Sequence, residues 1–522
     1  MKKYLLSKVS KFIFSFLFIF VLFVIYFFSM IYVNKPLQPL QQRFSNKFHV
    51  DMKKAGMMND IQGGFYRDGT WHVYFLYSDK IRFNAKGWKF GELGTNVYHV
   101  TTKDWLNWEY EGIAIKKNMT RYADISSGTI FEDLDNWFGY GNDAIISINS
   151  SFFDEGQNIL GYYSTDGGYN FLPIKQEPII NINQEIPENR SDFRDPYFFK
   201  MDNKYVVYLA QNEYFGVWVS DNPTSGFEKV GKITVPHPML ECPNLYQMNV
   251  FGSNEKKWVL FYGGNGSWGK DEDGYSVGTY YTIGDIDNNY VFIPDKNFTS
   301  KRLDFGPDYY AANFMKKDKG IKNINSLVTT GWIGNWSYIY QSPNDGRYGA
   351  MSLARNLKLN KSKNDYFISS KIIDYENSGL TKTKIFSNST NFNNLSGAYQ
   401  LNVNLKDVQD FNEAITFSFF DSFYKIDIYL DFKKNKVCIK RNTSYKILQE
   451  RSEFIKTREF NVKFSKNDIL KIFLDKRIIE LEFPNGYTFT MSKFLGTKND
   501  EKLSIIMQNN YQISMDYYNL DI

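Results

Sequence analysis

A repeated pattern of a polar turn followed by an aromatic-rich strand most constrains the fold of this chain. Turn and strand occur together at residues 68–75, 202–208 and 255–261. A further element ends each unit at an aromatic residue, and the closing residues Trp108, Phe171 and Phe227 are 63 and 56 residues apart. A period near 60 residues with about four strand signals per unit is typical of propeller blades. The repeated part of the chain, roughly 300 residues, has room for about five of them.

The pattern changes near residue 360, where strict alternation of apolar and polar side chains begins. One face of a predicted strand is formed by Tyr424, Ile426, Ile428, Leu430 and Phe432. This period of two is typical of a strand that is buried on one face only. Residues 479–483 repeat the pattern and lead into a Pro-Asn-Gly turn. We therefore expect an all-β protein, with a β-propeller over residues 42–360 and a β-sandwich over residues 361–522.

The first 41 residues differ in character from the rest of the chain. Residues 12–33 are an unbroken apolar run of 22 residues, enough at about 1.5 Å per residue to cross a hydrocarbon core of roughly 30 Å. Four lysines precede the run, and by the positive-inside rule they hold the N-terminus in the cytoplasm and place the rest outside. The sequence thus predicts a transmembrane anchor and a spacer over residues 1–41. The alternative is a cleaved signal peptide and secretion, although the apolar region of a signal peptide is usually only about 7–15 residues long.

The net charge of +5 comes from this N-terminal segment. All five charged residues in positions 1–41 are lysines, so the remainder carries 57 basic and 57 acidic residues. A neutral folded part lacks the clustered basic surface that nucleic-acid binding requires, and a neutral polysaccharide suits it better. The four histidines have no metal-ligand spacing and no glycine-rich phosphate loop stands out, so the sequence predicts neither a metal site nor a cofactor. Cys242 and Cys438 fall in different predicted domains, which argues against a disulfide framework.

Three short acidic motifs are far apart in the chain and centre on Asp60, Asp195 and Glu241. Asp60 and Asp195 are 135 residues apart, and Glu241 lies 46 residues further on. They form one site only if the fold returns three separate segments to a common point. A closed ring of repeated β-sheets does this.

These motifs and further segments of the chain resemble glycoside hydrolase family 32, whose members act on β-fructofuranosides. His49 followed by residues 56–64 resembles the family's H…G-W-M-N-D-P-N-G segment. Residues 98–108 are similar to its W-x-H-A-x-S-x-D-L-x-x-W stretch, and residues 304–312 to its D-x-G-P-D-F-Y-A-A segment. The resemblance covers most of the chain. It implies a five-bladed β-propeller followed by a β-sandwich, and fructan as the partner of the site.

The resemblance also implies roles for the three carboxyls. Asp60 would be the nucleophile, Glu241 the acid catalyst, and Asp195 the residue that grips fructose hydroxyls and stabilises the oxocarbenium-like transition state. Glu241 lies among apolar residues in the sequence, a setting that raises the pKa of a carboxyl. Arg194 is next to Asp195, where a guanidinium would favour ionisation of the aspartate. Taken alone, these residues are also typical of an Asx turn, an ordinary loop glutamate and an Arg-Asp-Pro turn.

Besides Arg194, five further side chains are predicted to contact the sugar: Asn59, Gln62, Ser127, Trp332 and Trp336. Asn59 and Gln62 can donate hydrogen bonds to a carboxylate or to fructose hydroxyls. Ser127 lies in Ser126-Ser127-Gly128-Thr129, where the family has W-S-G-S. Trp332 and Trp336 resemble a family segment near the pocket. The alternative is a core position, since propeller blades pack on aromatic strands.

Several positions depart from the family pattern. Met57 stands where the family has tryptophan, Ile61-Gln62 where it has P-N, and Asn244 where it has aspartate. Leu76 replaces the glutamine of the invertases' F-Y-Q-Y-N strand, and the pattern resembles the levan-cleaving branch of the family. The leading hypothesis is therefore a membrane-anchored, extracellular, retaining β-fructosidase that acts on levan-type fructan with water as the acceptor. A fructosyltransferase with the same covalent intermediate and an inactive carbohydrate-binding propeller are the alternatives.

Overall fold

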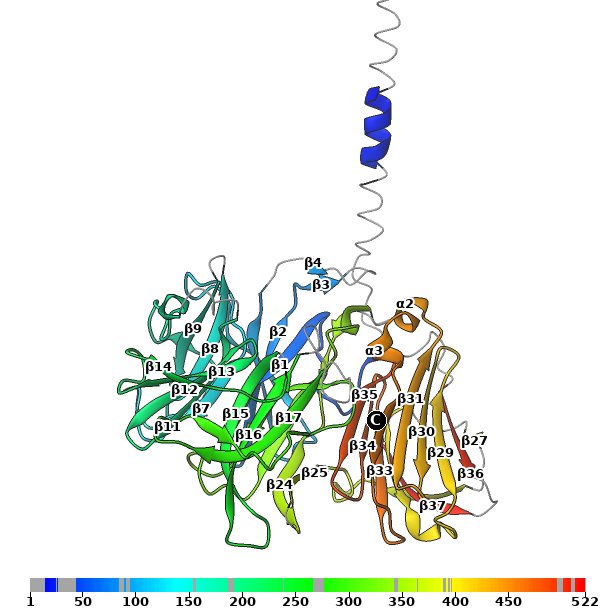
Figure 1. Cartoon of the computed structure of the whole chain (residues 1–522). Coiled ribbons are helices and arrows are strands. Elements are labelled where there is room, and N and C mark those ends of the chain that lie inside the picture. Colours follow the sequence, from blue (N-terminus) through cyan, green and yellow to red (C-terminus); the bar gives the residue numbers. More distant parts are fainter. Residues whose placement is uncertain are drawn as a thin grey trace, which may run out of the picture.

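In the computed structural model the protein is all-β, as the sequence predicts (Figure 1). It describes residues 15–24, 26, 44–83, 89–90, 94–153, 156–185, 192–237, 239–265, 277–341, 346–363, 365–387, 391–392, 395, 397–494, 501–507 and 512–521. Beyond the N-terminal segment, the helices in this part of the chain are single turns. They are α2 (Lys446–Gln449), α3 (Ser452–Ile455) and 3-10 turns at Ile182–Gln184, Ile339–Gln341 and Leu405–Asp407.

The first sheet contains two successive groups of four antiparallel strands. Its order is β10-β9-β8-β7-β1-β2-β5-β6, and β22 lies beside β1. β1 and β7 meet in parallel at the pair Gly63 and Ile130. The strands are β1 (Gly56–Arg67), β2 (Thr70–Ser78), β5 (Asn96–Thr102), β6 (Glu109–Ile115), β7 (Gly128–Glu132), β8 (Ile145–Phe153), β9 (Gly156–Ser164), β10 (Leu172–Pro173) and β22 (Arg347–Tyr348). A small separate sheet pairs β3 (Arg82–Phe83) with β4 (Lys89–Phe90).

Three more sheets follow along the chain, and the first strand of each contacts the first strands of other sheets. The second sheet is β11 (Arg194–Met201), β12 (Lys204–Gln211), β13 (Tyr214–Ser220) and β14 (Glu228–Ile233). The third is β15 (Leu240–Asn249), β16 (Lys256–Gly264), β17 (Gly278–Ile286) and β18 (Phe292–Pro294), with β19 (Lys301–Arg302) beside β17. The fourth is β20 (Tyr309–Met315), β21 (Leu327–Ile333), β24 (Arg355–Ser362) and β25 (Asp365–Ile372), with β23 (Ala350–Met351) beside β21.

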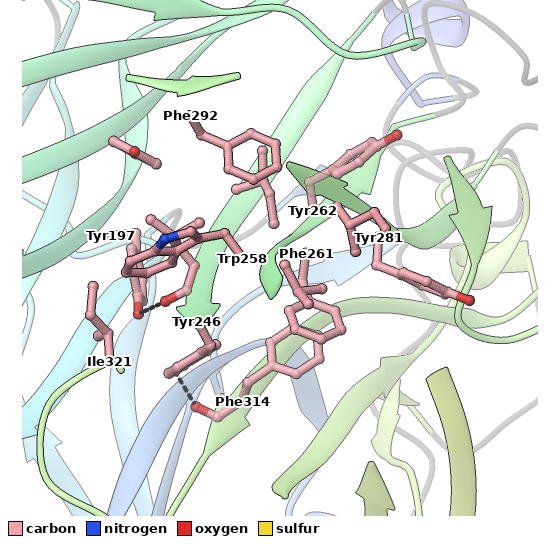
Figure 2. Close-up of a cluster of buried hydrophobic side chains, with 14 of the residues drawn as sticks. Tyr197, Tyr246, Trp258, Phe261, Tyr262, Tyr281, Phe292, Phe314 and Ile321 are labelled. Atoms are coloured by element: carbon pink, nitrogen blue, oxygen red, sulfur yellow. Dashed lines mark hydrogen bonds between the residues drawn. The ribbon is translucent and has the colours of Figure 1, made fainter. Parts of the chain in front are cut away.

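The first strands of these groups contact one another in a closed ring. β1 contacts β7, β7 contacts β11, β11 contacts β15, β15 contacts β20, and β20 contacts β1. Tyrosine hydroxyls link neighbours in this ring, as Figure 2 shows. Tyr197 of β11 donates to the Leu245 carbonyl of β15 over 2.8 Å, and Tyr246 of β15 donates to the Phe314 carbonyl of β20 over 2.9 Å. The aromatic ring of each tyrosine thus packs in the core while its hydroxyl remains hydrogen-bonded.

The C-terminal part consists of two six-stranded sheets. The first has the order β26-β37-β28-β33-β34-β35 and the second β27-β36-β29-β30-β31-β32. Side chains of both sheets form one buried hydrophobic cluster, so the two sheets lie face to face. The strands are β26 (Lys382–Ser387), β27 (Asn391–Phe392), β28 (Tyr399–Asn404), β29 (Ala414–Phe420), β30 (Tyr424–Asp431), β31 (Lys436–Thr443), β32 (Arg458–Asn461), β33 (Ile469–Leu474), β34 (Ile478–Glu482), β35 (Thr488–Ser492), β36 (Lys502–Met507) and β37 (Ile513–Asn519).

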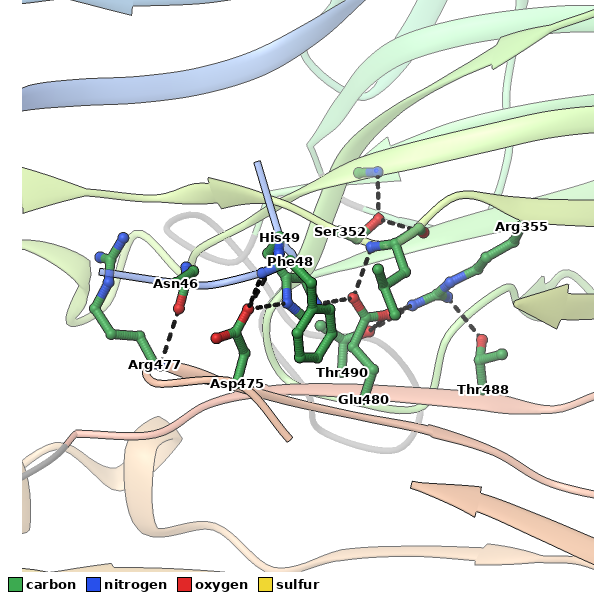
Figure 3. Close-up of polar contacts among 12 residues, drawn as sticks. Asn46, Phe48, His49, Ser352, Arg355, Asp475, Arg477, Glu480, Thr488 and Thr490 are labelled. Atoms are coloured by element: carbon green, nitrogen blue, oxygen red, sulfur yellow. Dashed lines mark hydrogen bonds and ion pairs between the residues drawn. The ribbon is translucent and has the colours of Figure 1, made fainter. Parts of the chain in front are cut away.

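A buried ionic cluster joins the ring to the C-terminal sheets, and Figure 3 shows most of it. The two nitrogens of His49, just before β1, lie 3.0 Å from Asp475 and 3.0 Å from Glu480 of β34. Arg355 of β24 donates to Glu480 over 2.6 Å and to Asp304 over 2.7 Å. Burial alone would lower the pKa of His49, but the two carboxylates raise it to about 9. His49 therefore serves as a buried cation in this junction.

The structure bears on two predictions from the sequence, the transmembrane segment and the domain boundary at residue 360. Of the predicted transmembrane segment, only residues 15–24 and 26 are described; the rest lies outside the described residues. Among the described residues, no helix has the length and apolar character to cross a membrane. The predicted domain change at residue 360 falls inside β24, and β25 then pairs with β24 along its full length. The strand that follows residue 360 therefore pairs within the fourth sheet, while the alternating residues 424–431 and 479–482 lie in β30 and β34 of the C-terminal sheets.

Candidate active site

The three predicted carboxyls lie near the starts of three first strands of the ring. Asp60 is in β1, Asp195 is in β11, and Glu241 is in β15. The charges of Asp195 and Glu241 both act on Asp60, so the ring brings the three groups into one cluster. The Cys242 N–H donates to Asp195 Oδ2 over 3.1 Å and so connects β15 to β11 at this point.

A break in strand register marks the place of each site residue. The breaks lie between Met58 and Ile61 in β1, Arg194 and Tyr197 in β11, Glu241 and Asn244 in β15, and Tyr310 and Asn313 in β20. Inside them Asp195, Cys242 and Ala311 have φ values of 54°, 51° and 43°. A bulge inserts a residue and redirects its side chain, and a left-handed backbone at residues other than glycine is typical of functional sites. A break in strand register therefore occurs beside the cluster in four of the first strands, β1, β11, β15 and β20.

Asp60 is held by one short hydrogen bond. Ser127 Oγ donates to Oδ2 of Asp60 over 2.5 Å, while Oδ1 is buried and has no hydrogen-bond partner in the described structure. Burial, and then the charge of Asp195, raise the pKa of Asp60 to about 8, against the lowering effect of the Ser127 hydrogen bond. A buried carboxyl with an unused oxygen beside like charges is typical of a reactive group.

Asp195 is buried and fixed through both its backbone and its side chain. Its N–H donates to Ser150 Oγ over 3.1 Å, and its carboxylate accepts from Cys242. Burial, and then the charge of Glu241, raise the pKa of Asp195 to about 6, while the charge of Arg194 works in the opposite direction. The cluster thus contains two aspartates whose pKa values are both above their usual range.

Glu241 is bound by three side chains from other parts of the ring. Arg194 donates to Oε1 from Nε and Nη2 over 3.1 and 2.8 Å. Asn265 donates to Oε2 over 3.1 Å, and the Tyr310 hydroxyl also donates to Oε2. Sequence neighbours placed Glu241 in an apolar setting, and this expectation is wrong, because Arg194, Asn265 and Tyr310 bind its two oxygens. Arg194 also lowers the pKa of Asp195, as its place next to that residue predicts. The contact between β11 and β15 adds the hydrogen bonds from its guanidinium to Glu241.

The predicted sugar contacts separate into two kinds. Gln62 and Trp332 are fully buried, so they have no surface to offer a sugar in this structure. Gln62 donates to the Asp60 carbonyl over 3.3 Å, and the ring centre of Trp332 lies 4.7 Å from that of Trp336. Trp336 and Asn59 are half-buried, and Asn59 Oδ1 has no hydrogen-bond partner in the described structure. Gln62 and Trp332 therefore support their neighbours, while Asn59 and Trp336 keep accessible surface.

Sequence reasoning missed Asn265, Tyr310 and Cys242 as members of the site. Tyr310 and Cys242 lie in segments that carry the family resemblance, so their motifs were a usable signal. Asn265 follows β16 and has no comparable motif, so only the pairing of β15 with β16 brings it to Glu241. Among the described residues, no group of three His, Cys, Asp or Glu side chains is arranged to hold a metal ion.

A cavity of about 150 Å³ lies further along the same first strands, separate from the carboxyls. Its lining includes Gly64 of β1, Thr129 of β7, Tyr197 of β11 and Asn313 of β20. In β1 and β11 these residues follow the carboxyls along the strand. The cavity therefore belongs to the interior of the ring beyond the site.

Comparison with known proteins identifies the family of the chain. The model of the glycosyl hydrolases family 32 N-terminal domain matches residues 49–370. The chain is 31% identical over 332 residues to a levanbiose-producing levanase of Bacillus subtilis, a match that spans 60% of this chain and 58% of that relative. It is also 31% identical over 330 residues to a levanbiose-producing levanase of Geobacillus stearothermophilus, which covers 60% of this chain and 76% of the relative.

Solved structures show the same fold. A fructofuranosidase from Schwanniomyces occidentalis, complexed with fructosylnystose, aligns with a TM-score of 0.76 at 21% identity. The alignment covers 92% of this chain and 99% of the other, so it includes the C-terminal sheets that lie beyond the family match. The family match itself spans more than half of the chain. The chain therefore belongs to glycosyl hydrolase family 32.

Proposed function

We propose that this chain is a retaining glycoside hydrolase that cleaves β-fructofuranosidic bonds. The observation that carries the proposal is the cluster of Asp60, Asp195 and Glu241 beside one guanidinium, that of Arg194. Because a neighbouring negative charge raises the pKa of a carboxyl, Asp60 and Asp195 both have raised pKa values, and the cluster retains at least one proton near neutral pH. A double displacement requires this state, with one carboxylate ionised and one carboxyl protonated.

In the proposed mechanism, Asp60 attacks the anomeric carbon of a fructosyl unit while Glu241 gives its proton to the leaving glycosidic oxygen. The bond between that carbon and the oxygen breaks, and an ester to Asp60 forms. Water then gives a proton to Glu241, and its oxygen displaces Asp60 from the anomeric carbon, which restores both groups. Arg194 and Tyr310 fix the Glu241 carboxyl in position for both proton transfers.

The other predicted residues receive binding and positioning roles in the same proposal. Asp195 accepts hydrogen bonds from fructose hydroxyls and stabilises the positive charge that develops on the sugar. Asn59 and Trp336 provide sugar contacts, since both keep accessible surface. Ser127 keeps the attacking oxygen of Asp60 aligned through its hydrogen bond to the other oxygen.

Levan-type fructan is the substrate class that we propose. Two relatives at 31% identity are levanbiose-producing levanases, and Gln62 and Leu76 match the levan-cleaving pattern in the sequence. Met57 and Asn244 replace family residues of the frame in which invertases hold sucrose, which disfavours sucrose as the main substrate. An extracellular location fits this substrate, because a polysaccharide does not cross membranes; relatives named extracellular exo-inulinases also support it.

We also propose that the ring is a five-bladed β-propeller and that the two C-terminal sheets form an accessory β-sandwich. The closed contacts among β1, β7, β11, β15 and β20 support a five-membered ring. We place the boundary between the two units after Ile372, where β25 ends, rather than at residue 360. The predicted unit of residues 42–360 thus becomes slightly longer.

The test is product analysis after incubation with levan, inulin and sucrose, with Asp60→Ala as the inactive control. We expect release of fructose or short fructo-oligosaccharides from levan, with β-fructofuranose as the first product by NMR. Products in which fructosyl units have been added to an acceptor sugar would instead indicate a fructosyltransferase. Activity on none of the three substrates in a folded protein would reject the proposed function, and α-fructofuranose as first product would reject the mechanism.

A further inference from the structure

A polar groove lies at the far end of β15 from Glu241. The hairpin turn after β15, the loop that precedes β21 and strand β24 form its walls. Glu241 and Asn249 are eight residues apart on β15, which corresponds to about 27 Å at the usual rise of a strand. The groove is therefore a different place from the carboxyl cluster, although the same strand connects them.

The lining of the groove is rich in amides and hydroxyls, and it holds one aromatic side chain. Asn249, Asn254, Asn325, Ser253 and Ser326 contribute the polar groups. Phe251 is 64% exposed, more than Tyr169 at 42% or Phe152 at 40%. Amides and hydroxyls both donate to and accept from sugar hydroxyls, and the negative face of an aromatic ring attracts the C–H groups of a sugar. This combination suits a neutral carbohydrate.

The groove is rigid although it is built from turns. The Phe251 N–H donates to the Leu359 carbonyl over 2.7 Å, and the Asn249 N–H donates to the Ile324 carbonyl over 2.8 Å. An isolated β-bridge between Val250 and Leu359 fixes the hairpin to β24. A carbohydrate site that is ordered before binding loses less conformational entropy when the ligand arrives.

One buried acceptor in the groove lacks a partner. Asn249 Nδ2 donates to Asn325 Oδ1 over 2.8 Å, which orients the amide, but Asn249 Oδ1 is buried without a hydrogen-bond partner in the described structure. An unsatisfied buried oxygen costs free energy, and a sugar hydroxyl satisfies it once the Asn249 side chain turns toward the groove. This observation is independent of the exposed aromatic ring.

The two lysines of the groove contact neutral groups of the protein. Lys256 Nζ donates to Asn323 Oδ1, and Lys358 Nζ lies 4.5 Å from the centre of the Phe251 ring. The Lys358 ammonium thus covers one part of the Phe251 side chain and holds its aromatic ring in place, as a cation–π contact does. The asparagine and serine side chains of the groove are the groups that we expect a neutral carbohydrate to contact.

We propose that this groove is a second carbohydrate-binding site that holds a distant part of the fructan chain while another part is cleaved. The inference rests on the proposed function for the nature of the polymer. A di- or trisaccharide is too short to reach both sites, so only long substrates benefit from the groove. Attachment at one site raises the effective concentration of the polymer at the other.

The experiment compares binding of levan in affinity gels by Asp60→Ala protein with and without the change Phe251→Ala. We expect the apparent dissociation constant for levan to rise by about tenfold on loss of the second contact. Phe251→Tyr keeps an aromatic face and is expected to retain binding. Tyr429→Ala removes an exposed aromatic residue of the C-terminal sheets and is the matched control.

Kinetics of the protein with Asp60 intact give the second measurement. Phe251→Ala should lower kcat/KM on levan and leave kcat/KM on a trisaccharide within about twofold. Equal levan affinity with and without Phe251 would overturn the inference and leave the proposed function untouched. Binding that disappears in salt and is as strong for dextran sulfate would also overturn it, in favour of an anion site. If no fructan is cleaved but levan retention still depends on Phe251, the proposed function fails and the groove stands as a glycan site.

Discussion

Two buried charge clusters in this protein have opposite electrostatic character. In the active-site cluster, burial and like charges raise the pKa of Asp60 to about 8 and that of Asp195 to about 6. In the junction cluster, burial would raise the pKa of Asp475 and of Glu480, but His49, and for Glu480 Arg355 as well, hold both below their usual range. Both sets of carboxyls are buried, so burial does not explain the difference.

The difference follows from the number of cations and from the use of the carboxylate oxygens. In the active-site cluster, the one guanidinium of Arg194 is shared by Glu241 and Asp192, and Asp60 Oδ1 has no hydrogen-bond partner among the described residues. In the junction, both oxygens of Glu480 are bonded, Oε1 to His49 and Oε2 to Arg355. Removing one partner of a buried, fully bonded ion pair is strongly destabilising, while unpaired carboxyls provide protons and reactive oxygens. We therefore expect substitutions in the first cluster to change rates and substitutions in the second to change stability.

The largest effect is expected from Asp60→Asn, which removes the proposed nucleophile and keeps the shape of the side chain. The rate on levan should fall by roughly 10³- to 10⁵-fold, since the covalent step is lost. The melting temperature should stay the same or rise, because a carboxyl with a raised pKa opposes folding when it ionises. Initial rates and thermal unfolding measure the two quantities. A large loss of stability would show that the two clusters do not differ in the way described.

Glu480→Ala removes the carboxylate shared by His49 and Arg355, and we expect it to lower stability rather than the rate on levan. Two buried cations lose a partner, so the free energy of unfolding should fall by about 3–5 kcal/mol. Folded protein should retain most of its rate on levan, because the change is in the junction. The matched control is Glu459→Ala, whose ion pair with Lys436 is exposed and should change stability by less than about 1 kcal/mol. Denaturant titration gives both values, and similar losses in the two variants would contradict the prediction.

The pH dependence of stability sharpens the comparison. The pKa of His49 is raised to about 9 in the folded state, so its contribution is fully present below the unfolded value near 6.5 and is lost as pH rises through about 9. Between pH 7 and pH 10 the wild-type protein should lose about 2.5 kcal/mol more than His49→Gln. Urea unfolding at the two pH values measures this difference. Parallel losses in the two proteins would show that His49 is not a buried cation.

The sequence was informative wherever chemistry lies in a contiguous motif. The positions of Asp60, Asp195 and Glu241 on separate strands of a ring were predicted from three motifs and a repeat. The partner of Arg194 was not predicted, because the contact of β11 with β15 decides it and sequence neighbours do not. Gln62 was predicted to face the sugar, but the register shifts on either side of Ile61 leave its side chain fully buried.

The domain boundary shows a second limit of sequence patterns. Alternation of period two appears both in the last strands of the ring and in the C-terminal sheets, so the pattern does not separate them. The residues beyond 360 join the ring because β25 pairs with β24 from Asp365 to Ile372. Non-local pairing of this kind depends on which strand is nearby in space, and a single sequence does not contain that information.

A smaller effect is expected from Tyr310→Phe, which removes one of the donors to Glu241. In the first transition state Glu241 becomes charged as it gives up its proton. A hydrogen bond to a charged group is worth about 1.5–3 kcal/mol, so kcat/KM should fall by roughly 10- to 100-fold. Tyr309→Phe is the matched control, since its hydroxyl lies 3.2 Å from Thr329 Oγ1 in the interior of the ring. The control should change stability and leave kcat/KM nearly unchanged. Equal kinetic losses in both variants would argue that Tyr310 has only a packing role.

The smallest effect is expected from Ser127→Ala, which removes the hydrogen bond to Asp60 Oδ2. That bond lowers the pKa of Asp60, so its loss should raise the pKa further. Since the nucleophile acts in its ionised form, the acid limb of the kcat/KM profile should move to higher pH by up to about one unit. The rate on the alkaline side of that limb should change little, because Asp60 is ionised there in both proteins. Ser126→Ala, one residue away, serves as the control, and a profile that drops uniformly at all pH values would mean that Ser127 positions Asp60 without tuning its charge.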